Sequence, residues 1–164
     1  MSKFSRIQIL EIILICLCNI NDICGKESRI EPIDAKCLTC ICFGASGCGK
    51  EAKCDSDVCG MFAIGYDYWS ESGQPTLAFD DPTADGAYMR CASDLHCAAR
   101  TVENHMNKFP YDCNADRKIN CWDYAGVHNR GYIRCADFWD IDFDRNFQNC
   151  MTNKTMIMKF ITDY

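Results

Sequence analysis

Four of the chain's fifteen cysteines fall within the twelve residues from Cys37 to Cys48. Such a density does not suit an extended strand or a featureless loop, so several crosslinks from distant parts of the chain must converge on this cysteine-rich segment. Fifteen cysteines in 164 residues also reach the range of disulfide scaffolds, and a reducing cytosol would leave them as reactive thiols. The sequence therefore predicts a single domain, stapled by disulfides, in an oxidising compartment.

Zinc is the competing explanation for these cysteines. Cys37 with Cys40, and Cys40 with Cys42, could each be a pair of ligands. However, no second Cys-x-x-Cys pair and no His-x-x-x-His block follows at the spacing of a zinc site. We therefore favour disulfides and expect no metal and no cofactor.

The chain is acidic, with a formal net charge of −6 and a sequence pI of about 5.0. It contains no basic tract, and an acidic protein is repelled by phosphate backbones, which argues against a nucleic-acid partner. The same charge disfavours unspecific adhesion to anionic membranes or bacterial walls. We expect a monomer that has neither a nucleic-acid nor a membrane partner.

Residues 1–25 have the pattern of a secretory signal peptide. Lys3 and Arg6 give a positive start, and residues 12–18 form an apolar core that is too short to span a bilayer. Cleavage could follow Cys18 or Gly25. Cleavage after Gly25 leaves twelve cysteines, an even number, so parity favours that site. The mature protein is then expected to be secreted and extracellular.

The rest of the chain reads as an α+β domain that is mainly helical. We expect a polar lead-in at 26–36, the domain at 37–151 and a tail at 152–164. Glycine and proline positions indicate a surface loop at 74–86. Ser93 is expected to cap a long amphipathic helix that stops before Pro110, because apolar residues recur there at spacings of three and four. The other expected helices end near Cys48, open at 66–69, and span 119–128 and 143–151.

Four segments resemble invertebrate-type lysozymes, the destabilase family. They are the CLTCICFGASGC run at 37–48, CGMFAIGYDYW at 59–69, CASDLHCAARTVENHM at 91–106 and DYAGVHNRGYIRC at 123–135. The match covers roughly residues 37–150, in order and with matching cysteine spacings. The resemblance implies a lysozyme-like fold, with helices around a cleft and a small β element, and hydrolysis of the β-1,4 bonds of peptidoglycan.

The resemblance also implies a disulfide map that uses all twelve mature cysteines. Many family members have a seventh bridge, but its two positions hold Ser72 and Thr101 in this chain. The implied pairs are Cys37–Cys121, Cys40–Cys150, Cys42–Cys48, Cys54–Cys59, Cys91–Cys97 and Cys113–Cys135.

The catalytic pattern of the family is incomplete in this sequence. A glycosidase needs one carboxyl group as general acid and a second as nucleophile or base. The family's acid Glu precedes the Ser-Gly-Cys of the cysteine-rich segment, where this chain has Ala45, which cannot donate a proton. Asp57 is the best match to the second carboxylate, and Asp55 is the next. Glu51 is the nearest glutamate, in a loop beyond Cys48.

Some family members also cleave isopeptide bonds, through a serine that works with a lysine or histidine. Ser56 is the one serine in the corresponding loop, and His128 matches the family histidine. A serine activated by a histidine base is a chemically reasonable nucleophile. The alternative is that His128 is a structural residue near a helix end.

Three further features have alternative explanations. Residues 112–123 place acidic or amide groups in the pattern of a calcium loop, but Arg117 replaces the glycine at position 6, so we favour a turn that caps a helix at Cys121. Asn153 begins a glycosylation sequon. Aromatic residues could line a sugar cleft; among them we expect Trp69 in the core and Trp139 to be the most exposed.

The sequence therefore predicts a secreted protein of the invertebrate-type lysozyme family with impaired muramidase activity. One alternative is a non-catalytic protein that recognises peptidoglycan or a related saccharide. The other is an isopeptidase that acts through Ser56 and His128.

Overall fold

The structure is a computed structural model that describes residues 28–49, 53–55 and 57–153. Residues 1–25 with the expected signal peptide, Glu51, Ser56 and most of the expected tail lie outside the described residues. Helices and short strands make up the fold, as the sequence predicts. The helices are α2 (Ala35–Ser46), α3 (Tyr66–Glu71), α4 (Ala87–Ser93), α5 (Leu95–Lys108), α6 (Cys121–Arg130) and α7 (Ile141–Thr152), and the strands are β1 (Arg29–Ile30), β2 (Val58–Cys59), β3 (Ile64–Gly65) and β4 (Lys118–Ile119).

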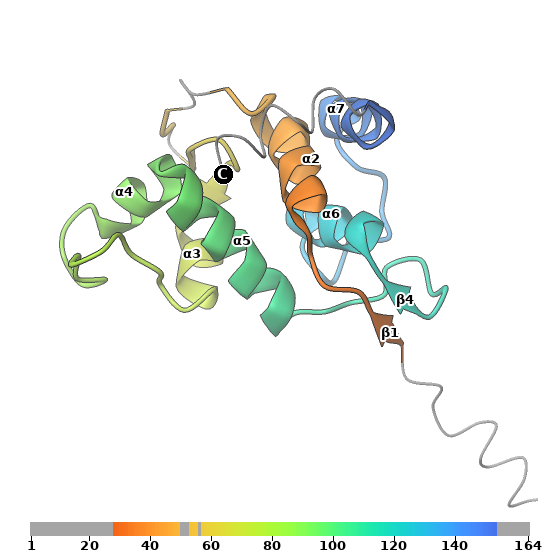
Figure 1. Ribbon diagram of the computed structural model, residues 1–164, viewed down its shortest axis with the longest axis horizontal. Helices are drawn as coiled ribbons and strands as arrows, with labels where there is room; N and C mark the ends of the chain where they lie inside the picture. Colours follow the sequence, from red (N-terminus) through yellow and green to blue (C-terminus); the bar gives the residue numbers. More distant parts are fainter. Residues whose placement is uncertain (1–27, 50–52, 56, 154–164) are drawn as a thin grey trace, which may run out of the picture.

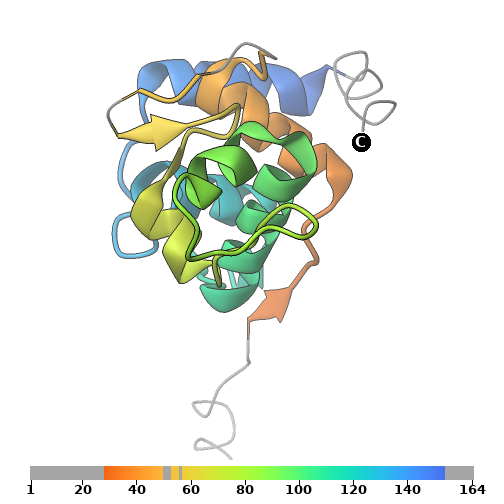
Figure 2. The same ribbon diagram turned by 90° about the vertical axis from the view of Figure 1, so that its left-hand side faces the viewer.

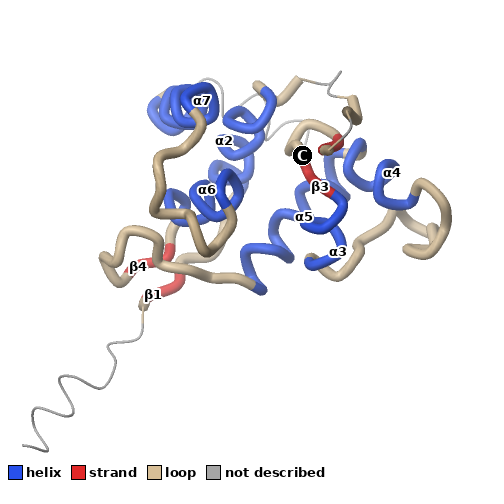
Figure 3. The backbone as a smooth tube through the Cα atoms, turned by 180° about the vertical axis from the view of Figure 1, so that it is seen from behind, coloured by secondary structure: helices blue, strands red, loops and turns tan. Residues whose placement is uncertain are grey.

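The helices form two groups. The first consists of α2, α6 and α7, and the second of α3, α4 and α5 (Figures 1 and 3). Figure 2 shows α7 lying alongside α2 at one edge of the molecule, and this pair makes the most extensive contact between helices. None of the described helices is long and apolar enough to cross a membrane.

The close contact between α2 and α7 depends on a glycine. A Cβ atom at Gly44 would lie 2.9 Å from the ring of Phe143, which is closer than a carbon atom can normally approach. Asp34 caps the start of α2 by accepting a hydrogen bond from the Cys37 amide at 2.7 Å, and Gly47 ends the helix in the left-handed conformation. Gly44 therefore lies in the last turn of α2, where this helix contacts α7.

Two pairs of short strands complete the fold. β2 and β3 form an antiparallel hairpin in which Cys59 pairs with Ile64. β1 pairs in parallel with β4, with Arg29 opposite Lys118. The described part of the polar lead-in at 26–36 contributes β1 and the first residues of α2.

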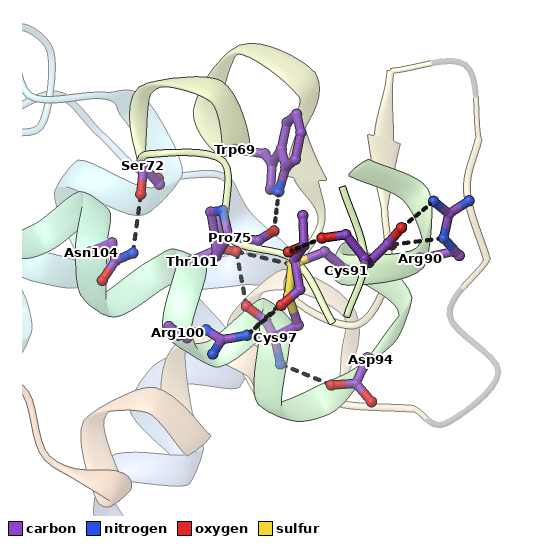
Figure 4. The surroundings of a disulfide bond; sticks show 12 residues. Trp69, Ser72, Pro75, Arg90, Cys91, Asp94, Cys97, Arg100, Thr101 and Asn104 are labelled. Carbon is purple, nitrogen blue, oxygen red and sulfur yellow. Dashed lines mark hydrogen bonds and ion pairs between the residues drawn. A yellow bond between two sulfur atoms is a disulfide. The ribbon is translucent and has the colours of Figure 1, made fainter. Parts of the chain in front are cut away.

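The segment expected to form one long helix is two helices, with a break at Asp94. The Asp94 backbone is extended, and its carboxylate accepts a hydrogen bond from the Cys97 amide at 2.9 Å (Figure 4). Asp94, and not Ser93, is thus the cap of α5, so the predicted cap was wrong by one residue. Both residue types suit this position, but Ser93 is the last residue of α4, and the Cys91–Cys97 disulfide spans the break.

Six disulfides join the pairs that the family resemblance implies. The two with the longest sequence separations, Cys37–Cys121 at 84 residues and Cys40–Cys150 at 110 residues, both start on α2. They tie α2 to α6 and α7 respectively. The cysteine-rich segment is therefore the point on which distant parts of the chain converge.

Ser72 and Thr101, at the positions of the absent seventh bridge, are both buried. The Ser72 hydroxyl donates to the Tyr68 carbonyl at 2.6 Å, and the Thr101 hydroxyl donates to the Cys97 carbonyl at 2.9 Å. Each hydroxyl thus bonds to the carbonyl four residues earlier, so burial leaves neither group without a partner. Figure 4 shows Thr101 beside the Cys91–Cys97 disulfide, and Ser72 accepting a hydrogen bond from Asn104 through its backbone carbonyl.

The calcium-like segment is a capping turn. Asp123 is buried and accepts hydrogen bonds from the amides of Cys113 and Asn120, both at 2.9 Å. Asn120 in turn caps α6, which begins at Cys121, whereas Ile119, expected to start this helix, lies in β4. Asp112 accepts from the amide of Arg117 at 2.7 Å. Within the described residues, no three His, Cys, Asp or Glu side chains are grouped so that they could hold a metal ion.

The tryptophans agree with the prediction in part. Trp69 is in the core, 1% exposed, as expected. Trp139 is not the most exposed: it is partly buried, with its ring against Phe143 and Phe147 of α7. Trp122, at 43% exposure, is the most exposed of the three.

Candidate functional site

Ala45 lies on the wall of a pocket of about 370 Å³ where the ends of several elements meet. The end of α2 supplies Gly44 and Ala45, the end of α6 supplies His128 and Asn129, and the start of α7 closes the opposite side. Val58 and Ala63 come from the hairpin region. The full lining is Gly44, Ala45, Val58, Ala63, His128, Asn129, Asp140, Asp142 and Phe143. A methyl group therefore occupies the position that the family resemblance assigns to the acid.

Two aspartates line this pocket, and each forms an ion pair with an arginine. Asp140 is paired with Arg130 at 3.2 Å and accepts from the Asn129 amide group at 3.1 Å. Asp142 is paired with Arg145 at 2.6 Å. Their side chains are 62% and 80% exposed. A general acid of this type needs a poorly solvated environment, which neither aspartate has.

Asp57 does not share the pocket of Ala45. Asp57 and Asp55 line a second, larger pocket of about 650 Å³, on the side of the hairpin that faces α3 and α4. The amides of Val58 and Asp57 donate to the Asp55 carboxylate and lower the pKa of Asp55. The structure thus places the two sequence-predicted catalytic positions, Ala45 and Asp57, on different pockets.

His128 is held by both of its ring nitrogens. Its Nε2 lies 2.9 Å from the Phe62 carbonyl oxygen, and its Nδ1 lies 3.2 Å from the Tyr68 hydroxyl. Because a carbonyl can only accept, Nε2 carries the proton, and Nδ1 accepts from Tyr68. Burial lowers the pKa of His128 to about 4, so the imidazole is neutral near pH 7.

A second histidine stacks on the same tyrosine. The His105 ring lies parallel to the Tyr68 ring with centroids 3.7 Å apart, and its Nδ1 is 3.3 Å from the Ser72 hydroxyl. His105 is 4% exposed, and burial, with a smaller contribution from His128, lowers its pKa to about 4. Burial also raises the pKa of Tyr68 well above its usual value. His105, Tyr68 and His128 therefore form a neutral aromatic cluster that joins α5, α3 and α6. His105 is stacked on Tyr68, and His128 meets Tyr68 edge-on.

The hydrogen bonds of His128 restrict its role in the predicted isopeptidase pair of Ser56 and His128. The Nε2–H group of His128 donates a hydrogen bond to the Phe62 carbonyl, so only Nδ1 could act as the base for Ser56. Nδ1 already accepts a hydrogen bond from the Tyr68 hydroxyl. These hydrogen bonds fit the alternative in which His128 is a structural residue near the end of α6. Ser56 lies outside the described residues, so the pair itself stays a prediction.

The two histidines predict an acid-sensitive stability. Each has a folded-state pKa of about 4 against about 6.5 when unfolded, so the unfolded chain binds more protons between these values. The contribution of the two histidines to the free energy of unfolding should be fully present above about pH 6.5. It should be lost as the pH falls toward 4, by about 3 kcal/mol per histidine. Urea unfolding across this range measures the effect. His105→Gln should flatten the profile, whereas His96→Gln, which removes an exposed imidazole, serves as the matched control.

Sequence reasoning missed the roles of His105 and of Asp140 and Asp142 at the start of α7. A signal for His105 was present: it lies on the apolar stripe of α5, where a polar side chain needs a buried partner. Asp140 and Asp142 lie in an acidic run with nothing local to distinguish them from solvated residues. Only the contact between α7 and α2 brings them to Ala45.

Comparison with known proteins agrees with this fold. The family model described as Destabilase matches residues 34–150. Invertebrate-type lysozyme 3 of Caenorhabditis elegans is 35% identical over 120 residues, which are 71% of this chain and 85% of that protein. In the crystal structure of Aeromonas hydrophila PliI in complex with Meretrix lusoria lysozyme, one chain is 26% identical with a TM-score of 0.56, over 75% of this chain and 94% of that one.

The crystal structure of Tapes japonica lysozyme shares the fold, with a TM-score of 0.51 at 22% identity, over 76% of this chain and 95% of that one. The region that the family model matches, residues 34–150, contains the six disulfides and the first residue of each described helix. The chain therefore belongs to the destabilase family of invertebrate-type lysozymes.

Proposed function

We propose that this protein is a secreted lysozyme-family protein that binds peptidoglycan or a related saccharide and has weak or no muramidase activity. The observation that carries the proposal is the methyl group of Ala45 on the wall of a pocket whose other carboxylates are exposed and paired with arginines. General acid catalysis is worth roughly 10²–10⁴-fold, so its loss should reduce turnover by about that factor.

Two further features support binding without efficient turnover. The scaffold that shapes the pocket is intact, since α2, α6 and α7 are joined by the two long-range disulfides. The net charge of −6 gives no general attraction to an anionic wall, so binding would depend on specific contacts. Six disulfides among the described residues agree with an extracellular protein.

The test uses the oxidised protein without residues 1–25 and a suspension of insoluble peptidoglycan. We expect the protein to sediment with the peptidoglycan while the turbidity of the suspension stays constant. An active lysozyme, run in parallel at the same concentration, provides the clearance rate for comparison. Clearance at a similar rate would contradict the impaired site, and Glu51→Gln would then test whether Glu51 is the acid. Absence of sedimentation would contradict the binding of peptidoglycan.

A further inference from the structure

The larger pocket, about 650 Å³, has walls from two separate loops and a floor of aromatic rings. Cys54, Asp55, Asp57 and Cys59 supply one wall, and residues 82–86 with the start of α4 supply the other. The lining comprises Cys54, Asp55, Asp57, Cys59, Tyr66, Trp69, Gln74 and the run 82–89. This pocket is separate from that of Ala45, with which it shares no lining residue.

The aromatic floor is fixed in place. The Tyr88 hydroxyl donates to the Ile64 carbonyl at 2.5 Å, and the Tyr66 ring packs edge-on against the Tyr88 ring at 5.6 Å. Trp69, fully buried, supports Tyr66 from below, and its indole donates to the Pro75 carbonyl at 2.7 Å (Figure 4). Tyr66 remains 56% exposed. An exposed ring on a rigid base offers a face on which the C–H groups of a sugar ring can stack.

The walls carry charge of one sign. Asp55, Asp57 and Asp85 all line the pocket, and no Lys, Arg or His side chain is among the described residues that line it. Arg90, at the back of the loop, pairs with Asp80 at 2.8 Å and donates to the backbone carbonyl of Asp85. The Asp55 carboxylate is near enough to raise the pKa of Tyr88, in addition to the effect of burial. The pocket is thus an aromatic platform between acidic walls.

We propose that this pocket binds an amine-bearing saccharide, a glucosamine-type sugar whose 2-amino group is free and protonated. The sugar ring stacks on Tyr66, and the ammonium group lies between the wall carboxylates, where it is also attracted by the tyrosine face. N-acetylation removes that charge, and the carboxylate of muramic acid would be repelled. The proposal rests on the saccharide binding proposed above and specifies which saccharide chemistry this second pocket selects.

The experiment compares a glucosamine tetramer with its fully N-acetylated form, by calorimetry at about pH 6, where the free amine is protonated. We expect the glucosamine tetramer to bind at least about ten-fold more tightly than the acetylated one. Asp85→Asn should weaken binding of the glucosamine tetramer about three-fold and leave the acetylated tetramer unaffected. Tyr66→Ala should weaken binding of both sugars. Glu71→Gln, the same charge change at an exposed site outside the pocket, should alter neither.

Equal affinity for the two tetramers, or no effect of Asp85→Asn, would overturn the proposal. So would equally tight binding of tetralysine, because charge alone would then account for the interaction. Thermal melting of each variant shows whether it is folded. The outcomes separate from those of the proposed function: peptidoglycan binding without discrimination between the tetramers contradicts this inference alone. Discrimination without peptidoglycan binding contradicts the peptidoglycan proposal alone.

Discussion

Replacing both Cys40 and Cys150 by alanine should lower the free energy of unfolding by about 4–5 kcal/mol. This bridge spans 110 residues, and a crosslink over such a span restricts the unfolded chain most strongly. Both cysteines are fully buried between α2 and α7, so their loss also removes packed atoms from the principal helix contact. Urea unfolding of the oxidised protein gives the value directly.

The matched control is the double alanine variant of Cys54 and Cys59. That bridge spans only 5 residues and joins the exposed Cys54 to the buried Cys59, so its removal should cost about 2 kcal/mol. A loss at Cys40–Cys150 that is no greater than the loss at Cys54–Cys59 would show that loop closure does not govern the stability of this domain.

Ala45→Glu should raise the rate of peptidoglycan clearance by about 10²-fold over the native protein. The new carboxyl would enter a pocket next to Phe143 and His128, and an apolar, partly buried setting raises the pKa of a glutamate toward that of a working acid. The amide variant, Ala45→Gln, has nearly the same size but cannot supply an acidic proton, so it should remain inactive. Initial rates of turbidity loss against pH measure both variants.

The comparison also tests the second carboxylate. Asp57 faces the larger pocket, while Asp140 and Asp142 face that of Ala45. Ala45→Glu combined with Asp57→Asn, and separately with Asp142→Asn, shows which of them the restored acid works with. If Ala45→Glu stays inactive while the protein remains folded and bound to peptidoglycan, the damage to the catalytic machinery extends beyond position 45.

Local sequence signals predicted the parts of the fold that local chemistry decides. Pro110 predicts the end of a helix, and α5 ends at Lys108, because proline acts on the backbone where it stands. The predicted cap of α5 was wrong by one residue because Ser93 and Asp94 are both good caps. In the structure Ser93 is the last residue of α4, so Asp94 is the cap.

The parts that were missed depend on contacts distant in sequence. β1 pairs with a strand about 90 residues later, and two-residue strands leave no periodic pattern in the sequence. Trp139 stands in an acidic segment that suggested exposure, yet α7 folds back and covers its ring with Phe143 and Phe147. The family motif located Ala45 and Asp57, but a motif carries no information on which side of the hairpin a carboxylate faces.

The glycine at position 44 has a consequence for how this chain can change over generations. Its missing side chain leaves room for the ring of Phe143, which also forms part of the pocket wall beside Ala45. A mutation to alanine there would displace the ring by a few tenths of an ångström or more, so one added carbon could reshape a pocket whose own residues are untouched. Packing alone therefore constrains position 44, even in a lineage no longer selected for hydrolysis, and any replacement there alters the helix contact and the pocket together.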